Sequence, residues 1–204
     1  MIRLFDIIFS LLGLIILSPL ILIVAVWIRI DSKGPILYRQ SRVGLHNIDF
    51  RLLKFRSMRI NSDKAGLLTV GGRDSRITSA GYWLRKYKID ELPQLLNVLK
   101  GDMSLVGPRP EVRKYVDMYN DVQKKVLMVR PGITDMASIA YKNENELLAI
   151  SPDPEKTYIE QVMPEKLKLN MLFIEKPTLG NYFRIIFKTL FSISRASRPA
   201  ISLF

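Results

Sequence analysis

The sequence predicts a mostly helical α+β protein with an N-terminal membrane segment, and three observations support this fold class. Residues 7–28 form an apolar run without a single charged side chain. Two short segments rich in β-forming residues follow at 34–44 and 48–58, a pattern typical of paired strands. Most of the remaining chain carries apolar residues at helical spacing.

The composition excludes several classes of protein. The 204 residues are 48% hydrophobic and 25% charged, a balance that fits neither a disordered chain nor a polytopic membrane protein. Because cysteine is absent, disulfides and thiolate metal sites are excluded, in agreement with a reducing, cytoplasmic setting. His46 is the single histidine, so neither a multi-histidine zinc site nor a Ser-His-Asp triad is expected.

Positive charge is concentrated in one part of the chain. The formal net charge is +12, and residues 29–130 carry 21 Lys and Arg against 10 Asp and Glu. Residues 131–176 reverse this balance, with 5 basic side chains against 8 acidic ones. Such a basic block can face nucleic acid, an anionic bilayer or a polyphosphate substrate, and composition does not choose among them.

The apolar run is long enough to cross a membrane. As a straight helix its 22 residues extend about 33 Å at about 1.5 Å per residue, against a hydrocarbon core of about 30 Å. Ser18 and Pro19 lie at its midpoint, where the missing backbone donor of proline predicts a kink. The run is therefore either a kinked spanning helix or a re-entrant hairpin that enters and leaves on one face. Either way, the basic body is expected in the cytoplasm.

The body of the chain divides into short elements. Residues 61–76 have the glycines and polar residues of a loop, and a helix is expected to begin near Thr78. Beyond Pro110 the pattern predicts a helix at 111–129, a turn and a strand at 130–141, a short helix at 143–150, and a helix after Pro164.

Two adjacent carboxylates, Asp90 and Glu91, precede an apolar helix face. The face consists of four leucines at helical spacing, Leu92, Leu95, Leu96 and Leu99. Pro93 is tolerated only in the first turn of a helix, which places both carboxylates at the helix N-terminus.

A helix cap explains Asp90 without any chemistry, but it leaves Glu91 unexplained. Cations crowd the same stretch, namely Arg85, Lys86, Lys88, Lys100 and Arg109. Arginine binds phosphate oxygens, one carboxylate can hold Mg²⁺ on a diphosphate, and a second carboxylate can attack phosphorus. The combination therefore points to phosphoryl transfer.

The tail, residues 181–204, predicts a basic amphipathic helix at a membrane surface. Its apolar face is formed by Phe183, Ile186, Phe187 and Leu190, and its basic face by Arg184, Lys188 and Arg195. The alternative is a buried domain helix whose cations reach solvent along their aliphatic stems.

The sequence resembles the small monotopic bacterial phosphoglycosyl transferases, the sugar transferase family that starts lipid-linked glycan assembly. The resemblance is carried by the apolar segment with Ser18-Pro19, "LLKFRSM" at 52–58, "RITSAGYWLRKYKIDELPQLLNVLKGDMSLVGPRPE" at 76–111, and "RPGIT" at 130–134. These motifs are ordered and cover most of the chain.

The resemblance implies a reaction and a set of site residues. Members of the family transfer a phosphosugar from a UDP-sugar to a polyprenyl phosphate such as undecaprenyl phosphate, release UMP, and begin O-antigen, capsule or glycoprotein assembly. By the family pattern, Asp90 is the nucleophile that carries the phosphosugar, and Glu91 is the Mg²⁺ ligand. Arg85 contacts phosphate, and Arg109 belongs to the Pro-Arg-Pro loop of the site.

Lys54, Arg56 and Arg130 are further candidates for phosphate contact, with a solvated or ion-paired structural role as the alternative. The resemblance implies that residues 1–30 are a re-entrant helix broken at Ser18-Pro19. Residues 31–180 would form a catalytic domain on the cytoplasmic face of the bacterial inner membrane. Besides the substrates and the lipid, a second copy of the chain is a candidate partner.

Asp135 departs from the family pattern, in which glycine follows "PGIT", and a carboxylate there is expected to alter sugar or nucleotide contacts. Two other functions compete with the transferase. A membrane-anchored nucleic-acid-binding module would bind nucleic acid in a salt-dependent way, but the basic block has few aromatic residues, and no nucleic-acid partner is expected. A purely structural scaffold would tolerate Asp90→Asn.

Overall fold

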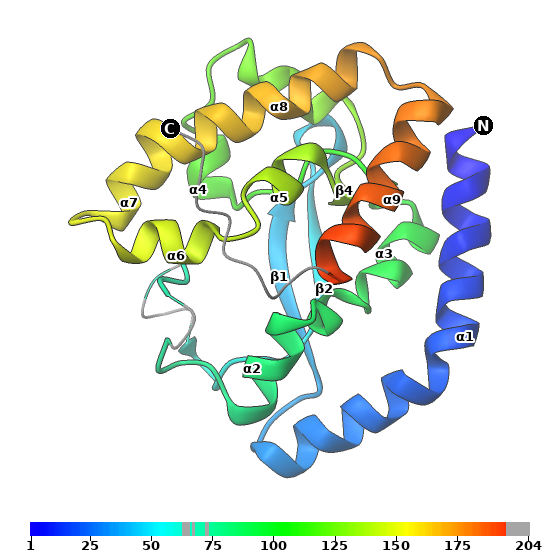
Figure 1. The fold of residues 1–204 in the computed structure, drawn as a ribbon, viewed down its shortest axis with the longest axis vertical. Coiled ribbons are helices and arrows are strands. Elements are labelled where there is room, and N and C mark those ends of the chain that lie inside the picture. Colours follow the sequence, from blue (N-terminus) through cyan, green and yellow to red (C-terminus); the bar gives the residue numbers. More distant parts are fainter. Residues whose placement is uncertain (63–65, 67, 72–73, 195–204) are drawn as a thin grey trace.

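A computed structural model describes residues 1–62, 66, 68–71 and 74–194 of the chain (Figure 1). The strands are β1 (Leu37–Val43), β2 (Asp49–Phe55), β3 (Ser104–Val106) and β4 (Gly132–Thr134). The α-helices are α1 (Ile2–Asp31), α2 (Ser79–Lys86), α3 (Gln94–Lys100), α4 (Arg113–Val116), α5 (Met136–Ala140), α6 (Glu144–Ala149), α7 (Pro154–Thr157), α8 (Met163–Glu175) and α9 (Leu179–Ser194). The mostly helical α+β class is confirmed.

The long helix α1 bends without being interrupted. Figure 1 shows its two halves running in different directions, with the corner pointing away from the rest of the molecule. Pro19 lies inside the helix, and the Ser18 hydroxyl donates to the carbonyl of Ile15 at 2.8 Å. The missing proline donor and the hydroxyl bond to the preceding turn account for a bend, so the expected break is a bend in a continuous helix.

The outer side of α1 is apolar and uncovered. Within the described chain, α1 is the helix long and apolar enough to cross a bilayer, and only 11% of its most apolar window is buried. A core helix of a soluble protein would be mostly buried. The exposed apolar surface therefore indicates contact with lipid.

The N-terminal half of α1 is fixed to the body by two charged side chains. Arg3 donates to the carbonyls of Val98 and Leu99, at 2.6 and 3.1 Å, and so caps the C-terminus of α3. Asp6 is 1% exposed, and its Oδ1 accepts hydrogen bonds from Ser104 Oγ, the Leu105 amide and Tyr182 OH. Three donors compensate the buried carboxylate.

The C-terminal end of α1 is fixed to the same body by Arg56. This guanidinium donates to the carbonyl of Ser32 at 2.7 Å, and its other bonds reach the carbonyls of Ile28 and Lys33. A cation at these carbonyls also complements the helix dipole. Both ends of α1 are therefore held by one folded unit.

The two predicted strands are confirmed as the antiparallel hairpin β1–β2, joined by a short turn at Leu45–Asn47. The register pairs Tyr38 with Lys54, so the two side chains share a face of the sheet. Gln40 and Arg42 follow on that face at the strand period of two, which directs a polar edge at the interior cavity.

The segment that carries the acidic pair differs from its prediction. Helix α2 begins after Thr78, which caps it as expected, and Ile89–Glu91 then form a separate 3-10 turn, η3, ahead of α3. The buried face of α3 combines Val98 with two polar side chains, Gln94 and Asn97, which are 2% and 1% exposed. Asn97 bonds to the β2 backbone at Leu53, and Leu96 on the leucine face is 38% exposed.

The second sheet depends on two glycines. Strands β3 and β4 pair in parallel, and a Cβ on Gly132 would lie 2.1 Å from the backbone nitrogen of Gly107. Only glycine permits this approach, which sets the start of the loop 108–110. The helix predicted at 111–129 is wrong as one element, because the chain forms only α4 and a 3-10 segment at Gln123–Met128.

The C-terminal helices complete the body. The helix predicted after Pro164 begins earlier, because α7, a π-helical turn at Tyr158–Val162 and α8 follow without a gap. In α9, Tyr182 and Ile185 are buried, whereas Phe187 and Leu190 are exposed. The first turns of the predicted amphipathic tail therefore pack into the domain, and its later turns have an exposed apolar face. Residues 195–204 of that tail lie outside the described chain.

We expect Asp6→Ala to lower the free energy of unfolding by about 3 kcal/mol, because three buried donors lose a charged acceptor. Thermal and denaturant unfolding of the lipid-reconstituted protein measures this. Asp121→Ala is the matched control, since its side chain is fully exposed and its loss should leave the unfolding midpoint unchanged. Equal midpoints for the two variants would contradict the anchoring role of Asp6.

Candidate active site

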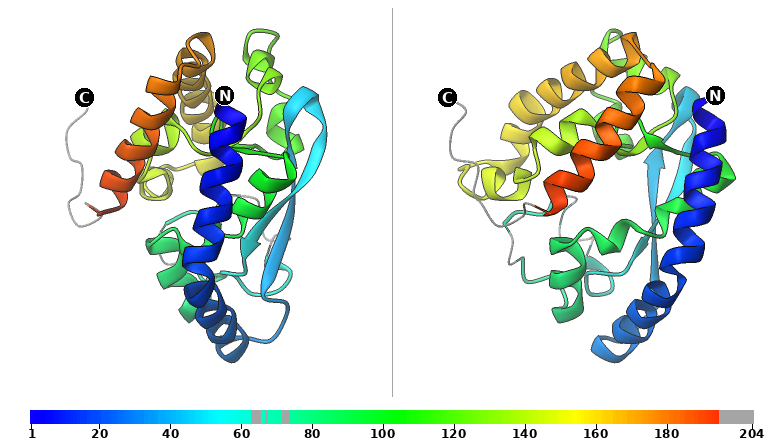
Figure 2. Two further views of the ribbon diagram at one scale, coloured as in Figure 1. Left: turned by 90° about the vertical axis from the view of Figure 1, so that its right-hand side faces the viewer. Right: turned by 45° about the vertical axis from the view of Figure 1, so that its right-hand side comes forward.

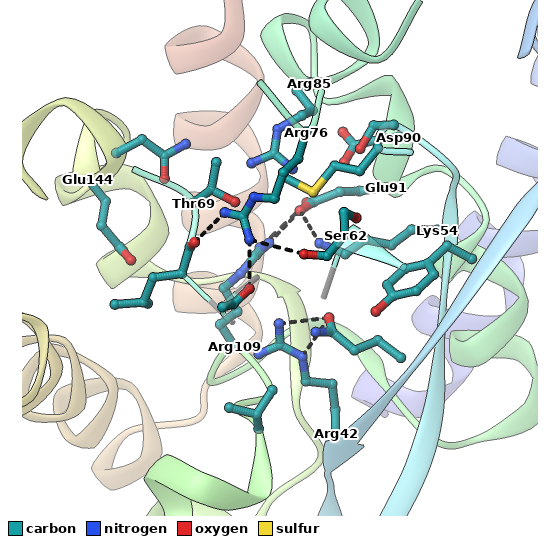
Figure 3. Close-up of a pocket in the computed structure, with 18 of the residues that line it drawn as sticks. Arg42, Lys54, Ser62, Thr69, Arg76, Arg85, Asp90, Glu91, Arg109 and Glu144 are labelled. Atoms are coloured by element: carbon teal, nitrogen blue, oxygen red, sulfur yellow. Dashed lines mark hydrogen bonds and ion pairs between the residues drawn. The ribbon is translucent and has the colours of Figure 1, made fainter. Parts of the chain in front are cut away.

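A cavity of about 480 Å³ lies between the β1–β2 hairpin, η3 and the loop 108–110. Cations from separate segments line it, among them Arg42, Lys54, Arg76, Arg85 and Arg109. Figure 3 shows Lys54 and Arg109 directed at Glu91, with Asp90 beside it. Cations far apart in the sequence therefore meet around the acidic pair.

The turn η3 places the two carboxylates in the cavity wall. Lys88 precedes it in the left-handed conformation, with φ 57° and ψ 20°, which is unfavourable for a residue other than glycine. This reversal ends α2 at Lys86 and turns the chain toward the cavity, so that Asp90 and Glu91 both line it.

Glu91 is the anionic centre of the cluster. It forms ion pairs with Arg109 and, at 3.3 Å, with Lys54. Burial by itself would raise the pKa of Glu91, but the positive charges of Arg109 and Lys54 outweigh it and hold that pKa well below its usual range. Burial lowers the pKa of Lys54 to about 8, although Glu91 favours its charged form. Glu91 is therefore ionised at neutral pH.

Asp90 has the opposite environment. Its side chain is 5% exposed, and its buried Oδ1 has no hydrogen-bond partner among the described residues. Burial raises the pKa of Asp90, the Glu91 carboxylate raises it further, and Lys54 opposes both effects. Two neighbouring carboxylates thus have pKa values displaced in opposite directions, an arrangement that favours distinct chemical roles.

Arg85 and Arg109 reach the acidic pair from two sides. Arg85 lies in the last turn of α2 and has no ion-pair partner in the part of the chain that the structure describes. The Arg109 backbone is held by Asp135, whose Oδ2 accepts the Arg109 amide at 2.8 Å. Arg85 is thus available to an anionic ligand, whereas Arg109 is positioned by its neighbours.

Asp135 does not line the cavity. Its other oxygen accepts the amide of Ser138 and so caps α5, and the side chain is 1% exposed. An influence of Asp135 on sugar or nucleotide contacts, as expected from the sequence, would therefore be indirect. The carboxylate instead accepts a hydrogen bond from the backbone of the loop 108–110 and so fixes the position of Arg109.

Two predicted phosphate-contact residues are placed elsewhere. Arg56 borders the cavity, but both of its terminal nitrogens bind the carbonyls at the end of α1. Arg130 does not line the cavity, and its Nε donates to the carbonyl of Gly101 at 3.0 Å. Arg56 and Arg130 therefore have structural roles, as the alternative given from the sequence expected. The structure brings Lys54, Arg85 and Arg109 together with the acidic pair.

A second polar cluster in the same cavity was not predicted from the sequence. Arg42 forms an ion pair with Glu111 at 2.8 Å, and Tyr158 OH donates to the other oxygen of that carboxylate. Glu111 directly follows the Pro-Arg-Pro motif, which was a usable signal. Nothing local distinguishes Tyr158, because only tertiary structure brings α7–α8 to this wall.

The carboxylates fit a particular kind of metal site. No group of three or more His, Asp and Glu side chains is arranged to hold a metal ion in the described residues. Mg²⁺ commonly takes one or two protein carboxylates and completes its shell with substrate phosphates and water. Glu91 fits that mode as the single protein carboxylate, with a diphosphate ligand and water to supply the remaining oxygens.

A largely exposed apolar helix and a cation-lined cavity around two carboxylates are features expected of a membrane-attached protein that binds a phosphate ester. The chain matches the model of the family described as bacterial sugar transferase over residues 1–196. It therefore belongs to the bacterial sugar transferase family.

Several relatives are similar over most of this chain. The UDP-N-acetylgalactosamine-undecaprenyl-phosphate N-acetylgalactosaminephosphotransferase of Aeromonas hydrophila is 39% identical over 191 residues, which cover 92% of this chain and 42% of the relative. The UDP-glucose:undecaprenyl-phosphate glucose-1-phosphate transferase of Klebsiella pneumoniae is 34% identical, over 93% of this chain and 39% of the relative. The chain thus spans about two fifths of the length of these two proteins.

A third relative, the undecaprenyl-phosphate glucose phosphotransferase of Komagataeibacter xylinus, is 43% identical over 144 residues. These cover 67% of this chain and 27% of the relative. The names of all three proteins share a sugar phosphate as the group transferred and undecaprenyl phosphate as the acceptor.

We expect Asp135→Ala to lower the free energy of unfolding by about 2 kcal/mol, because a helix cap and the hydrogen bond from the Arg109 amide are lost together. Hydrogen exchange at the Arg109 amide should also become faster. Asp153→Ala is the matched control, since Asp153 caps α7 and contacts no part of the cavity. Asp153→Ala should lower the free energy of unfolding less than Asp135→Ala does, and the Arg109 amide should stay protected from exchange. Equal exchange of this amide in both variants would refute the role of Asp135 in holding Arg109.

Proposed function

We propose that this protein transfers a phosphosugar from a UDP-sugar to undecaprenyl phosphate and releases UMP. The observation that carries the proposal is the buried, partnerless oxygen of Asp90 in a cavity lined by cations, next to an ionised Glu91. The names of the relatives support the same substrates.

In the first step an Asp90 oxygen attacks the phosphorus that bears the sugar. A bond forms between Asp90 and that phosphorus, the bond between the two phosphates breaks, and UMP leaves with its electron pair. Arg85 and Arg109 lie beside Asp90, where they can bind the non-bridging oxygens and stabilise the charge that develops on them.

In the second step an oxygen of the lipid phosphate attacks the same phosphorus. The bond to Asp90 breaks, the carboxylate is restored, and a polyprenyl diphosphate sugar is formed. A covalent intermediate suits these substrates, because the soluble donor and the lipid acceptor then never need to bind together.

Mg²⁺ belongs to the proposal as the ion held by Glu91 and the diphosphate. When bound, it would neutralise phosphate charge and favour departure of UMP. Glu91 is held for this role by Lys54 and Arg109, which keep it ionised and fix its position.

The bend of α1 supports a re-entrant helix rather than a span. Arg3 and Asp6 bind the first half of α1 to the body, and Arg56 binds its C-terminal end to the same body. A spanning helix would separate these ends by the thickness of the membrane, whereas both attachments here are to one folded unit. The apolar corner then enters the bilayer, and the catalytic body lies at the cytoplasmic face of the inner membrane.

We expect Asp90→Asn to reduce turnover at least about a thousand-fold, because an amide cannot serve as the nucleophile. The assay measures UMP release from a panel of UDP-sugars with Mg²⁺ and undecaprenyl phosphate. The sugar that supports release by the wild type also identifies the donor.

An unchanged thermal midpoint for Asp90→Asn keeps this result separate from misfolding, and Lys100→Met serves as an exposed control with normal turnover. Chelation of divalent ions by EDTA should stop the wild type, and added Mg²⁺ should restore it. UMP release that persists in Asp90→Asn would assign the nucleophile to another residue, and turnover in EDTA would remove Mg²⁺ from the reaction.

For the re-entrant helix, we expect both ends of α1 to be shielded from the periplasm. Since the chain has no cysteine, a single cysteine inserted after Met1, or Lys33→Cys at the other end, provides a unique reporter. A membrane-impermeant maleimide should label each reporter in lysed cells and neither in intact cells. Labelling of the N-terminal reporter in intact cells would establish a spanning helix.

A further inference from the structure

A second cavity, of about 660 Å³, adjoins the active-site cavity and has a different lining. Apolar side chains form one part of its wall, namely Ile77, Tyr82, Leu92, Leu95, Ile133 and Ile139. Polar side chains form another part, namely Lys86, Ser138, Lys142, Asn143, Asn145 and Glu146. The proposed mechanism uses the first cavity for the nucleotide sugar and assigns nothing to this one. We call this second cavity the acceptor groove.

The two cavities share one charged boundary. Arg85, Lys88, Glu91 and Arg109 line both of them, whereas Asp90 lines only the first. The acceptor groove therefore ends at the cations that surround Asp90, but approaches them from a different side. Because an attacking and a leaving oxygen lie roughly in line in phosphoryl transfer, the attack that displaces Asp90 must come from a side that Asp90 does not occupy.

The two described α9 side chains that line the groove, Thr189 and Ser192, already have hydrogen-bond partners in the protein. Thr189 shares a hydrogen bond with Thr134 at 2.7 Å, and the Ser192 hydroxyl donates to the carbonyl of Thr189 at 2.8 Å. These side chains line the groove with their polar atoms already satisfied by the protein. An apolar chain can lie against such a wall without a desolvation cost.

The groove also adjoins the surface assigned to lipid. Helices α1 and α9 meet near their N-terminal ends, where Phe5 and Phe183 pack edge to face, and Figure 2 shows them diverging from there. Leu95 lines the groove and packs at the Gly13 position of α1, 3.3 Å from a Cβ built there. Two exposed apolar residues are next to groove residues in the sequence. Leu96 follows Leu95 on α3, and Phe191 precedes Ser192 on α9. An apolar path thus leads from the outer face of α1 to the shared cations.

We propose that the acceptor groove binds the lipid phosphate, with its isoprenoid chain between α9 and α3 and its phosphate at Arg85, Lys88 and Arg109. This rests on the proposed function and adds the site of its second substrate. The lipid phosphate oxygen forms the new bond to the phosphorus carried by Asp90, the bond to Asp90 breaks, and the carboxylate leaves as an anion. No further reactant is needed.

The test separates the two half-reactions. Exchange of labelled UMP into UDP-sugar needs no lipid and reports the first cavity, whereas transfer to undecaprenyl phosphate requires the acceptor groove. We expect Ser192→Trp, which fills the groove from α9, to raise the KM for undecaprenyl phosphate at least about ten-fold and to leave UMP exchange within about two-fold. Lys188→Trp, which adds the same side chain at an exposed position of α9 outside the groove, should retain both activities.

Direct labelling provides the second measurement. Undecaprenyl phosphate with a photoreactive tail should label peptides of α9 and of residues 92–95 in the wild type, and Ser192→Trp should lose this label. Excess undecaprenyl phosphate should compete with the probe, and inorganic phosphate at the same concentration should not, since the chain supplies much of the affinity.

Three results would overturn the groove assignment: unchanged lipid transfer in Ser192→Trp, equal loss of exchange and transfer in a variant with a normal unfolding midpoint, or labels confined to β1 and β2. Failure of the proposed function has a different signature, because the wild type would then show neither UMP exchange nor transfer with any UDP-sugar.

Discussion

The Glu91 carboxylate is the charge on which the arrangement of the site depends. It is nearly buried, and burial of an unpaired carboxylate is costly, so its ion pairs with Lys54 and Arg109 must be in place in the folded protein. These pairs join strand β2, turn η3 and the loop 108–110. Burial raises the pKa of Asp90 beside it, and the Glu91 charge raises that pKa further, so Glu91 influences both the cavity and the neighbouring carboxylate.

A similar use of buried charge attaches the membrane helix. Arg3 and Asp6 of α1 bind backbone groups and hydroxyls of the body, and Arg56 of the body binds the carbonyls at the end of α1. Many outer residues of α1 are apolar and exposed. In the proposed re-entrant arrangement, the depth of α1 in the bilayer also sets the depth of Asp90, because both ends of the helix are held. The body has two cavities that share one set of cations, a polar one that we propose for the soluble donor and a more apolar one that we propose for the lipid acceptor.

Sequence patterns were reliable where a feature is local. The hairpin and the start of a helix near Thr78 were predicted correctly because strand alternation and helix-start signals each span only a few residues. Patterns were unreliable where contacts with residues distant in the sequence determine the role of a side chain. Arg56 resembles a phosphate ligand in "LLKFRSM" but binds the carbonyls at the end of α1, and the fully buried side chains of α3 are Gln94, Asn97 and Val98 rather than the leucines.

The sequence by itself determined an apolar N-terminal helix with a bend at proline, a basic body and an acidic pair suited to phosphoryl transfer. These are properties of composition and of near neighbours along the chain. Tertiary structure alone decided which cations reach Glu91, since Lys54 and Arg109 are 37 and 18 residues away from it. It also decided that Asp135 braces Arg109 and that both ends of α1 meet one body, because such contacts depend on how distant segments pack.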